Sequence, residues 1–212
     1  MKTKLIYKLS LALNAFFIIG LTIIVCIFWD LISKKIFDKK KAKVVMFGDS
    51  ITQKGDWNKL LNRSDVKNSA VGGTTTTDYV GMIRKNVLHY KPSICFIEGG
   101  MNDILIGISL NRIKRNYSRV IDTLIANNVT PVIQSTLYQE NNPESKELVD
   151  SINVFLKDYS LKHGIYYLDL NSKLSSSTGL KPEYSLDGTH INTKAFELWS
   201  KEVKKVLEKI EG

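Results

Sequence analysis

The sequence contains few of the residues from which disulfide frameworks and metal sites are built. Its 212 residues include only two cysteines, Cys26 and Cys95, and three histidines. Two cysteines cannot form a disulfide framework, and both lie in apolar runs typical of buried thiols. The sequence also has no Cys-x-x-Cys pair and no His-x-x-x-His pair, so we expect no metal and no other cofactor.

The signatures of nucleotide and nucleic-acid binding are missing as well. There is no Gly-x-Gly-x-x-Gly turn and no P-loop. The net charge of +9 would favour phosphate binding, but its distribution argues otherwise: residues 1–43 hold nine lysines and two acidic residues, whereas residues 44–212 hold 21 basic and 19 acidic residues. Since the basic excess belongs to the N-terminal segment, we do not expect the remaining chain to bind nucleic acid.

One long uncharged run is present, at the N-terminus. Residues 9–29 carry no charge, and as a helix they would span about 31 Å, enough to cross the core of a bilayer. The run is long for a cleavable signal peptide, and no Ala-x-Ala-like site follows it. We therefore predict a membrane anchor over residues 1–33, with a transmembrane helix at about 9–29, followed by a Lys-rich linker over residues 34–43.

The lysines around this run give opposing indications of orientation. Six lysines follow the run and three precede it, and the positive-inside rule then favours a cytoplasmic domain. A short basic N-terminus before an apolar run is instead typical of export. We expect a single-pass protein whose folded domain is extracytoplasmic.

From residue 44 onward, short apolar runs alternate with helical patterns. We predict buried strands at Val44–Phe47, Ile94–Ile97, Pro131–Gln134 and Ile165–Leu168, with a fifth around Val66. Helices are expected near residues 56–62, 76–88, 110–127, 146–162 and 193–209. This alternation predicts one α/β domain over residues 44–212, a three-layer α/β/α sandwich with a five-stranded parallel sheet.

Four polar segments lie at or near the ends of these predicted elements. They are Gly48-Asp49-Ser50, Gly72-Gly73-Thr74, Gly100-Met101-Asn102-Asp103 and Asp187-Gly188-Thr189-His190. In open α/β sheets, sites form outside the carboxyl ends of the strands. We therefore expect the four segments to converge on one edge of the sheet.

The residue types in these segments suit acyl transfer. A serine hydroxyl needs a base to remove its proton, and that base needs an acidic partner, roles that Ser50, His190 and Asp187 can fill. Asp187 lies three residues before His190, so one loop can supply both. The backbone N–H groups of Ser50 and Gly73, together with the Asn102 side chain, are available to stabilise an oxyanion. Each residue alone is equally consistent with a helix cap, a turn or a loop hydrogen bond.

Together, the four segments resemble the blocks of the SGNH hydrolases, also called the GDSL family of esterases and lipases, over residues 44–212. This resemblance implies a flavodoxin-like sheet. It also implies Ser50 as nucleophile, His190 as base supported by Asp187, and an oxyanion hole made by Ser50, Gly73 and Asn102. Ile51 stands where the GDSL name has Leu, which is a common variation in the wider family.

We therefore predict a membrane-anchored serine esterase that needs no metal. Its substrate could be a short acyl ester, such as acetyl on a cell-envelope glycan, or a lipid ester. Two alternatives remain open: an envelope acyltransferase that uses the same three residues, and a non-catalytic glycan-binding module.

Overall fold

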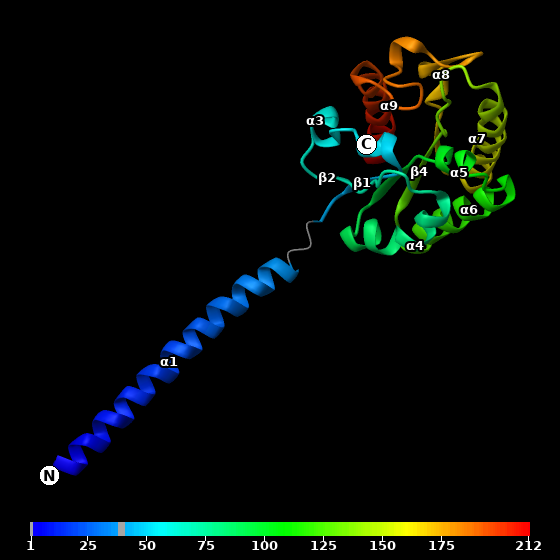
Figure 1. Ribbon diagram of the computed structural model, residues 1–212. Coiled ribbons are helices and arrows are strands. Elements are labelled where there is room, and N and C mark those ends of the chain that lie inside the picture. The colour runs from blue at the N-terminus through cyan, green and yellow to red at the C-terminus, as the bar shows by residue number, and fades with distance from the viewer. Residues whose placement is uncertain (1, 38–40) are drawn as a thin grey trace. The chain divides into compact units, whose positions relative to one another are not determined.

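The chain divides into two compact units, residues 1–40 and residues 41–212, which are described separately below (Figure 1). The structure is a computed structural model. It describes the backbone of residues 2–37 and 41–212, and the side chains of residues 11, 13–29 and 41–212.

The first unit consists of one helix, α1, over Lys2–Phe37. In the part of the chain that the structure describes, no helix combines the length and apolar character needed to cross a membrane. This finding does not support the predicted transmembrane helix at about 9–29, although residues 9, 10 and 12 fall outside the described side chains. The Lys-rich linker over residues 34–43 stays a prediction: α1 continues to Phe37, and residues 38–40 lie outside the described residues.

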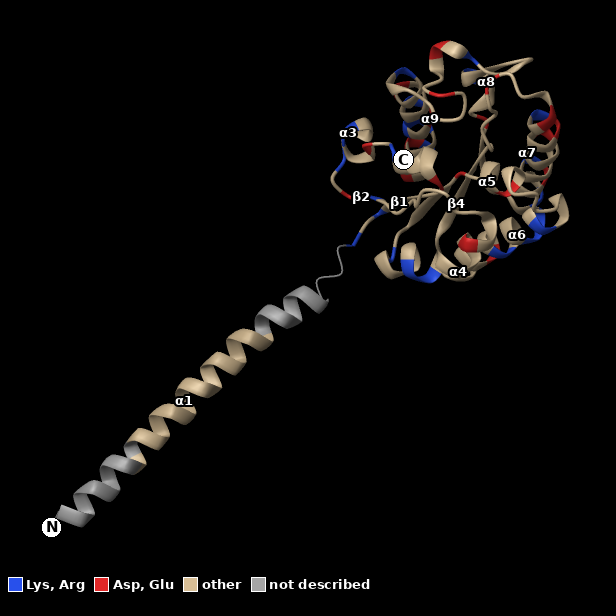
Figure 2. Ribbon diagram, in the orientation of Figure 1, with Lys and Arg blue, Asp and Glu red and all other residues tan. Residues whose placement is uncertain are grey.

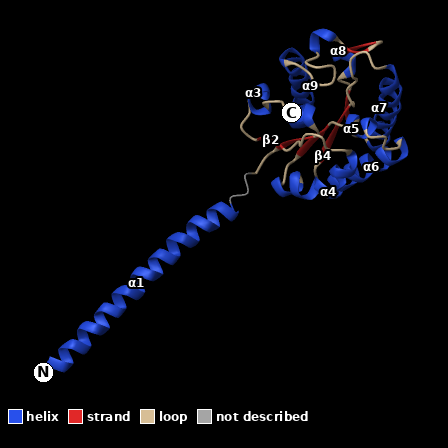
Figure 3. Cartoon of the chain, viewed as in Figure 1, coloured by secondary structure: helices blue, strands red, loops and turns tan. Residues whose placement is uncertain are grey.

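The second unit is built on a parallel sheet (Figure 3). Its strands are β1 (Val44–Phe47), β2 (Val66–Asn68), β3 (Ile94–Ile97), β4 (Thr130–Gln134) and β5 (Tyr166–Leu168). They lie in the order β2-β1-β3-β4-β5, and every neighbouring pair is parallel. All five predicted strands are therefore confirmed.

Helices cover both faces of this sheet (Figure 1). The longer ones are α4 (Thr76–Asn86), α6 (Leu110–Ala126), α7 (Pro143–His163) and α9 (Thr193–Glu211), with the shorter α3 at Trp57–Leu61. Each overlaps a helix predicted from the sequence. The α/β fold, with a five-stranded parallel sheet between layers of helices, is confirmed.

Alternation along the strands divides the core into two clusters. Val44 and Met46 pack on one face of the sheet with residues of α3 and α9, whereas Val45 and Phe47 pack on the other face with residues of α4, α6 and α7. All four residues of β1 are at most 1 % exposed. Successive side chains of a strand point to opposite faces, so a continuous apolar run is what a strand buried on both faces requires.

Several short elements are absent from the sequence prediction. They are α2 (Ser50–Gln53), α5 (Met101–Leu105), α8 (Asn171–Leu174), the two-stranded pair β6 (Ser175–Ser176) and β7 (Gly179–Leu180), and two single 3-10 turns, η1 (Leu88–Tyr90) and η2 (Pro182–Tyr184). Segments of two to five residues are too short to show a helical or strand period. Two of them matter for the site, since α2 begins at Ser50 and α5 contains Asn102.

Lysines, arginines and carboxylates are interspersed over the elements of the second unit (Figure 2). The ion pairs found among the described residues include local ones, such as Arg63 with Asp65 and Lys146 with Asp150, and one that joins distant segments, Arg63 with Glu211. This mixture agrees with the near balance of charge counted over residues 44–212.

Candidate active site

Ser50 lies at the first turn of α2, directly after β1. The Asp49 side chain caps this helix, because its Oδ1 accepts a hydrogen bond from the Ile51 N–H at 2.9 Å. A Cβ at Gly48 would lie only 2.7 Å from the carbonyl oxygen of Glu98, so the chain passes too close to β3 for a larger residue. Strand, glycine and cap together fix where the Ser50 hydroxyl sits.

Ser50, His190 and Asp187 form a continuous chain of contacts. His190 Nε2 lies 3.0 Å from Ser50 Oγ, and His190 Nδ1 lies 2.7 Å from Asp187 Oδ2. Both distances are within hydrogen-bonding range. The structure thus brings together three side chains from opposite ends of the domain sequence.

The Asp187 carboxylate also organises its own loop. Its second oxygen, Oδ1, accepts hydrogen bonds from the backbone N–H of His190 at 2.7 Å and of Thr189 at 3.1 Å. These backbone bonds, together with the contact to the His190 ring, lower the pKa of Asp187 well below its usual range. The side chain is also half exposed to solvent, which favours the charged form as well. The carboxylate is therefore ionised at neutral pH.

The loop that carries these two residues is anchored to the rest of the domain. The Leu186 N–H donates to the His190 carbonyl at 2.8 Å, and the Gly188 N–H donates to Ser185 Oγ at 2.8 Å. A third bond runs from the Glu140 N–H to the Gly188 carbonyl at 2.8 Å. Hydrogen bonds on both sides of Gly188 hold the His190 ring in place against Ser50.

Gly73 lies in a turn that borders the Ser50 helix. The turn is tied to α2 by a bond from the Gly72 N–H to Gln53 Oε1 at 3.1 Å, and a Cβ at Gly72 would lie 3.6 Å from the Ser50 Cβ. Gly73 adopts φ +75°, a left-handed conformation that favours glycine. Within residues 41–212, neither its N–H nor that of Ser50 has a protein acceptor, so both are free to meet a ligand.

Asn102 is attached to the same turn. Its Nδ2 donates a hydrogen bond to the Thr74 carbonyl at 3.0 Å. A side-chain amide nitrogen carries two protons, so one remains for a ligand. Gly100 begins the helix α5 that carries Asn102, with φ +105°. Its missing Cβ would come within 3.0 Å of Thr136 Oγ1. The close contact that Gly100 allows is therefore one with Thr136.

Asp103 holds two of these segments together. Its carboxylate accepts hydrogen bonds from the Thr76 N–H at 2.9 Å and from the Thr76 hydroxyl at 2.5 Å. Asp103 is fully buried, and burial raises its pKa. Asp49 and Asp103 thus both act through loop hydrogen bonds, as their positions next to Ser50 and Asn102 indicate.

A buried carboxyl group, Glu98, lies at the end of β3 behind this site. Its Oε2 accepts a hydrogen bond from Thr52 Oγ1 at 3.0 Å, while its Oε1 has no partner among the described residues. Burial raises the pKa of Glu98 well above its usual value, and it also raises the pKa of Asp49 to about 6.

Trp57 is part of the core of the domain and does not face a ligand. It is 1 % exposed, packs edge-on against Trp199 at 4.8 Å, and donates its indole N–H to the Thr52 carbonyl. Among the described residues, no group of three His, Cys, Asp or Glu side chains is placed to hold a metal ion.

Comparison with known proteins identifies relatives of the whole domain. N-acylneuraminate cytidylyltransferase of Streptococcus agalactiae (strain NEM316) is 24 % identical over 181 residues, which are 83 % of this chain and 41 % of that protein. The chain therefore spans less than half the length of this curated relative.

Solved structures share the fold at low sequence identity. A GDSL-like lipase from Bacteroides thetaiotaomicron superposes with a TM-score of 0.70 at 20 % identity, covering 81 % of this chain and 90 % of the other. A lipase/acylhydrolase from Enterococcus faecalis has a TM-score of 0.70 at 20 % identity, covering 79 % and 96 %. A catalytic mutant of an acetylxylan esterase from Geobacillus stearothermophilus has a TM-score of 0.67 at 16 % identity, covering 77 % and 93 %.

The pattern of the GDSL-like lipase/acylhydrolase family matches residues 46–198, which include the second half of β1, the other four strands of the sheet and every residue of the site described above. That match covers well over half of the chain. The protein belongs to the GDSL-like lipase/acylhydrolase family.

Proposed function

We propose that this protein is a serine esterase that cleaves carboxylic esters through an acyl-enzyme formed on Ser50. The observation that carries the proposal is the chain of contacts from Ser50 Oγ to His190 Nε2 at 3.0 Å and from His190 Nδ1 to Asp187 at 2.7 Å. Nucleophile, base and orienting acid stand in the order that such chemistry requires.

In the first half of the reaction, His190 Nε2 takes the proton of Ser50 Oγ as that oxygen attacks the ester carbonyl carbon. Asp187 holds the Nδ1–H of the ring and stabilises the imidazolium that forms. The carbonyl oxygen becomes an oxyanion, which the N–H groups of Ser50 and Gly73 and the free Asn102 proton stabilise. His190 then gives its proton to the departing alcohol as the C–O bond breaks.

In the second half, water replaces the alcohol. His190 accepts a proton from the water as its oxygen attacks the acyl carbon, and the same three donors stabilise the second oxyanion. The proton returns to Ser50 Oγ when the acyl group leaves as a carboxylic acid. Both halves of the cycle thus use the Ser50, His190 and Asp187 side chains together with the same three oxyanion donors.

The substrate we propose is a short acyl ester on a sugar, with a lipid ester as the alternative. Support comes from the names of two relatives, since one acts on an N-acylneuraminate and the other is an acetylxylan esterase. The part of the cytidylyltransferase that this chain matches is under half of its length. We therefore do not propose cytidylyl transfer for this protein.

The experiment is hydrolysis of p-nitrophenyl esters, from acetate to decanoate, by the full chain and by Ser50→Ala. Loss of the nucleophile should lower the rate to a small fraction of the wild-type value. Ser151→Ala, which removes a hydroxyl from the solvent side of α7, is the matched control and should retain full activity. A Ser50→Ala protein that cleaves at the wild-type rate would refute the mechanism.

The acyl-chain profile decides between the two substrates. A rate that peaks at acetate supports a sugar ester, whereas a rate that rises with chain length supports a lipid ester. If the purified protein reacts with a fluorophosphonate at Ser50 but releases little acid, product analysis with a glycan acceptor will distinguish an acyltransferase from an esterase.

The cellular location is a separate matter. An extracytoplasmic domain stays a prediction from the basic N-terminus and the uncharged run at 9–29. Fractionation of cells, followed by protease treatment of intact spheroplasts, tests it directly.

A further inference from the structure

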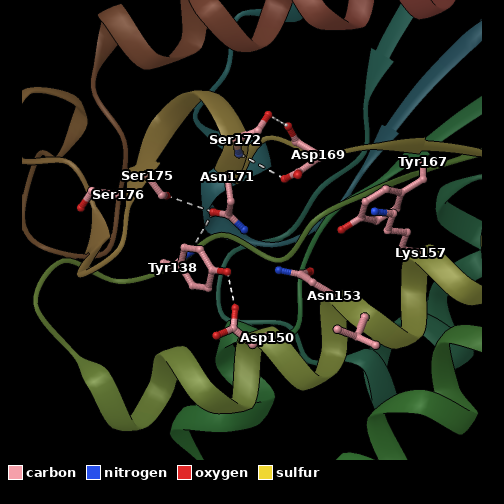
Figure 4. Close-up of a pocket in the computed structure, with 11 residues that line it drawn as sticks. Tyr138, Asp150, Asn153, Lys157, Tyr167, Asp169, Asn171, Ser172, Ser175 and Ser176 are labelled. Carbon is pink, nitrogen blue, oxygen red and sulfur yellow. Dashed lines mark hydrogen bonds between the residues drawn. The ribbon is translucent and has the colours of Figure 1, made fainter.

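A pocket lies between α7 and the end of β5, and its lining does not include Ser50, Asp187 or His190. Its volume is about 360 Å³. Helix α7 contributes Asp150 and Lys157, and the segments at the carboxyl ends of β4 and β5 contribute Tyr138, Tyr167 and Asp169. Figure 4 shows these side chains gathered around one opening.

The walls of this pocket are held by hydrogen bonds that converge on one residue. Asn153 of α7 accepts from the Thr136 N–H at 2.8 Å and donates to the Thr136 carbonyl at 3.0 Å. Asn171 donates to the same carbonyl at 2.7 Å from the other side. Because α7 and the segment after β5 are both fixed to Thr136, the pocket is formed without a ligand.

Three polar groups in this pocket keep hydrogen-bonding capacity for a ligand: Lys157, Tyr167 and Asp169. Within residues 41–212, neither the Lys157 ammonium nor the Tyr167 hydroxyl has a hydrogen-bond or ion-pair partner. Asp169 uses only Oδ1, which accepts from the Ser172 N–H at 3.2 Å (Figure 4). The pocket thus offers a cationic donor, a hydroxyl and a carboxylate oxygen. Sugar hydroxyls both donate and accept hydrogen bonds, so they match such a mixed set.

The charges of the pocket argue against an anionic ligand. Asp150 and Asp169 both line it, and the Asp150 carboxylate is already shared between Lys146, at 2.8 Å, and the Tyr138 hydroxyl. Lys157 is then the one unengaged cation among the lining residues. A purely apolar ligand is also disfavoured, because it would desolvate Lys157 and Asp169 without replacing their hydrogen bonds.

Aromatic rings supply the remaining feature of a sugar site. Tyr138 and Tyr167 line the pocket beside the polar groups, and a tyrosine ring offers an apolar face together with a polar tip. The Lys146 ammonium lies over one face of the Tyr138 ring, 4.8 Å from its centroid, which leaves the other face of that ring and the Tyr167 ring for a ligand. The apolar face of a pyranose ring can lie on such a surface while its hydroxyls reach the polar groups. We propose that this pocket binds one neutral sugar unit of a glycan.

A hydrogen bond joins the segment that carries Tyr138 to the loop that carries His190. Gln139, which follows Tyr138, donates from Nε2 to the Thr189 hydroxyl at 2.9 Å, and Thr189 precedes His190. Neighbouring parallel strands lie about 4.8 Å apart, so the ends of β1 and β5 are about 14 Å apart across three strand steps. A glycan of a few units can span that interval. We therefore infer that one glycan places its esterified unit at Ser50 and another unit in the pocket. This link between the two places rests on the proposed function.

The first experiment measures binding of xylotriose, cellotriose and chitotriose to the full chain carrying Ser50→Ala, by calorimetry and by ligand-observed NMR. We expect at least one trisaccharide to bind. Adding Lys157→Ala and Asp169→Asn should weaken that binding about 10-fold or more, since it removes charge-assisted hydrogen bonds. The control is Asp158→Asn with Lys162→Ala, which makes the same charge changes on α7 outside this pocket.

Binding of none of the three trisaccharides would overturn the proposal. So would equal weakening by the pocket variant and its control. The second experiment uses the chain with Ser50 intact and compares kcat/KM for O-acetylated xylotriose with that for p-nitrophenyl acetate. The ratio should fall about 10-fold in the pocket variant, and an unchanged ratio contradicts the link to the active site. If neither ester is cleaved, the proposed function fails while the binding experiment still decides the pocket.

Discussion

At the scale of single residues, the site depends on a few side chains with divided tasks. Asp187 uses one carboxylate oxygen to hold the His190 ring and the other to hold the loop backbone. Asn102 likewise uses one amide proton to hold the Thr74 carbonyl, which leaves the other proton for a ligand. A substitution at Asp187 or Asn102 therefore changes the catalytic rate without changing stability only when the new side chain keeps the hydrogen bond to the loop backbone.

Asp187→Asn is the replacement that keeps the shape of the loop. An amide oxygen can still accept one set of bonds, but the negative charge that supports the imidazolium is lost. We expect kcat to fall by about 10²- to 10⁴-fold, as for the acid of other Ser-His-Asp sites. The unfolding midpoint measured by circular dichroism should move little. A variant with kcat within 3-fold of wild type would contradict the proposed role of this carboxylate.

Asn102→Ala removes one oxyanion donor together with the hydrogen bond to the Thr74 carbonyl, so its unfolding midpoint is measured beside its kinetics. Loss of such a donor typically costs about 2.7 to 4 kcal/mol of transition-state stabilisation, or about 10²- to 10³-fold in kcat. We expect KM to change far less, because the donor is needed most when the oxyanion forms. Steady-state kinetics with p-nitrophenyl acetate measures both constants. A rise in KM with unchanged kcat would instead indicate a role in ground-state binding.

The raised pKa of Asp49 predicts how stability depends on pH. Burial raises its pKa to about 6 in the folded protein, against about 3.9 in an unfolded chain. Between these values the folded state binds more protons, so the free energy of unfolding should decrease as pH rises from 4 to 6. We expect Asp49→Asn to remove about 1 to 3 kcal/mol of that decrease. Urea unfolding at pH 4, 5 and 6 tests this, and parallel curves for the two proteins would contradict it.

At the scale of elements, α9 is attached to the sheet by its aromatic face. Trp199 is 1 % exposed, stacks against Phe196, and donates its indole N–H to Gln134 Oε1 of β4 at 2.6 Å. The polar partner is as important as the packing, because an indole N–H buried without an acceptor is costly. This contact places the start of α9 next to the loop that carries His190.

Trp199→Ala should therefore destabilise the domain strongly. Replacing a buried tryptophan by alanine typically costs about 3 to 5 kcal/mol. Lys201→Ala, on the exposed side of the same helix, is the control and should change the free energy of unfolding by less than about 0.5 kcal/mol. Urea denaturation followed by circular dichroism measures both. A cost below 1 kcal/mol for Trp199→Ala would show that α9 does not depend on this contact.

At the scale of the whole molecule, both core clusters lie inside the second unit. Their buried members run from Ala42 to Leu207, and among the described residues none belongs to α1. The site residues, from Ser50 to His190, lie in the same unit. The catalytic unit is thus expected to fold without the N-terminal helix.

Residues 41–212 expressed alone should match the full chain in thermal unfolding midpoint within a few degrees. The expected kcat with p-nitrophenyl acetate is the same for both proteins, because the described packing and the site are complete in this fragment. Differential scanning calorimetry and steady-state kinetics provide the two measurements. A fragment that is unfolded, or that unfolds far below the full chain, would show that α1 contributes to the core.

Much of this protein was determined by the sequence itself. The runs Val44–Phe47 and Ile94–Ile97 are short, continuous and apolar, and within an alternation with helical patterns they favour strands buried on both faces. The four polar segments also follow from the sequence, since glycines, a serine and an Asp-x-x-His spacing mark their chemistry whatever the order of the strands. The uncharged run at 9–29 predicted a membrane span that the described part of α1 does not support.

Only the tertiary structure decided how these parts meet. The order β2-β1-β3-β4-β5 comes from pairing between distant residues, which no local pattern encodes. The same is true of the 3.0 Å contact between Ser50 and His190, which are 140 residues apart. The buried Glu98 oxygen without a partner and the pocket beside Lys157 depend on what several elements leave between them. Propensity acts over a few residues, whereas burial and free hydrogen-bonding groups are properties of the packed chain.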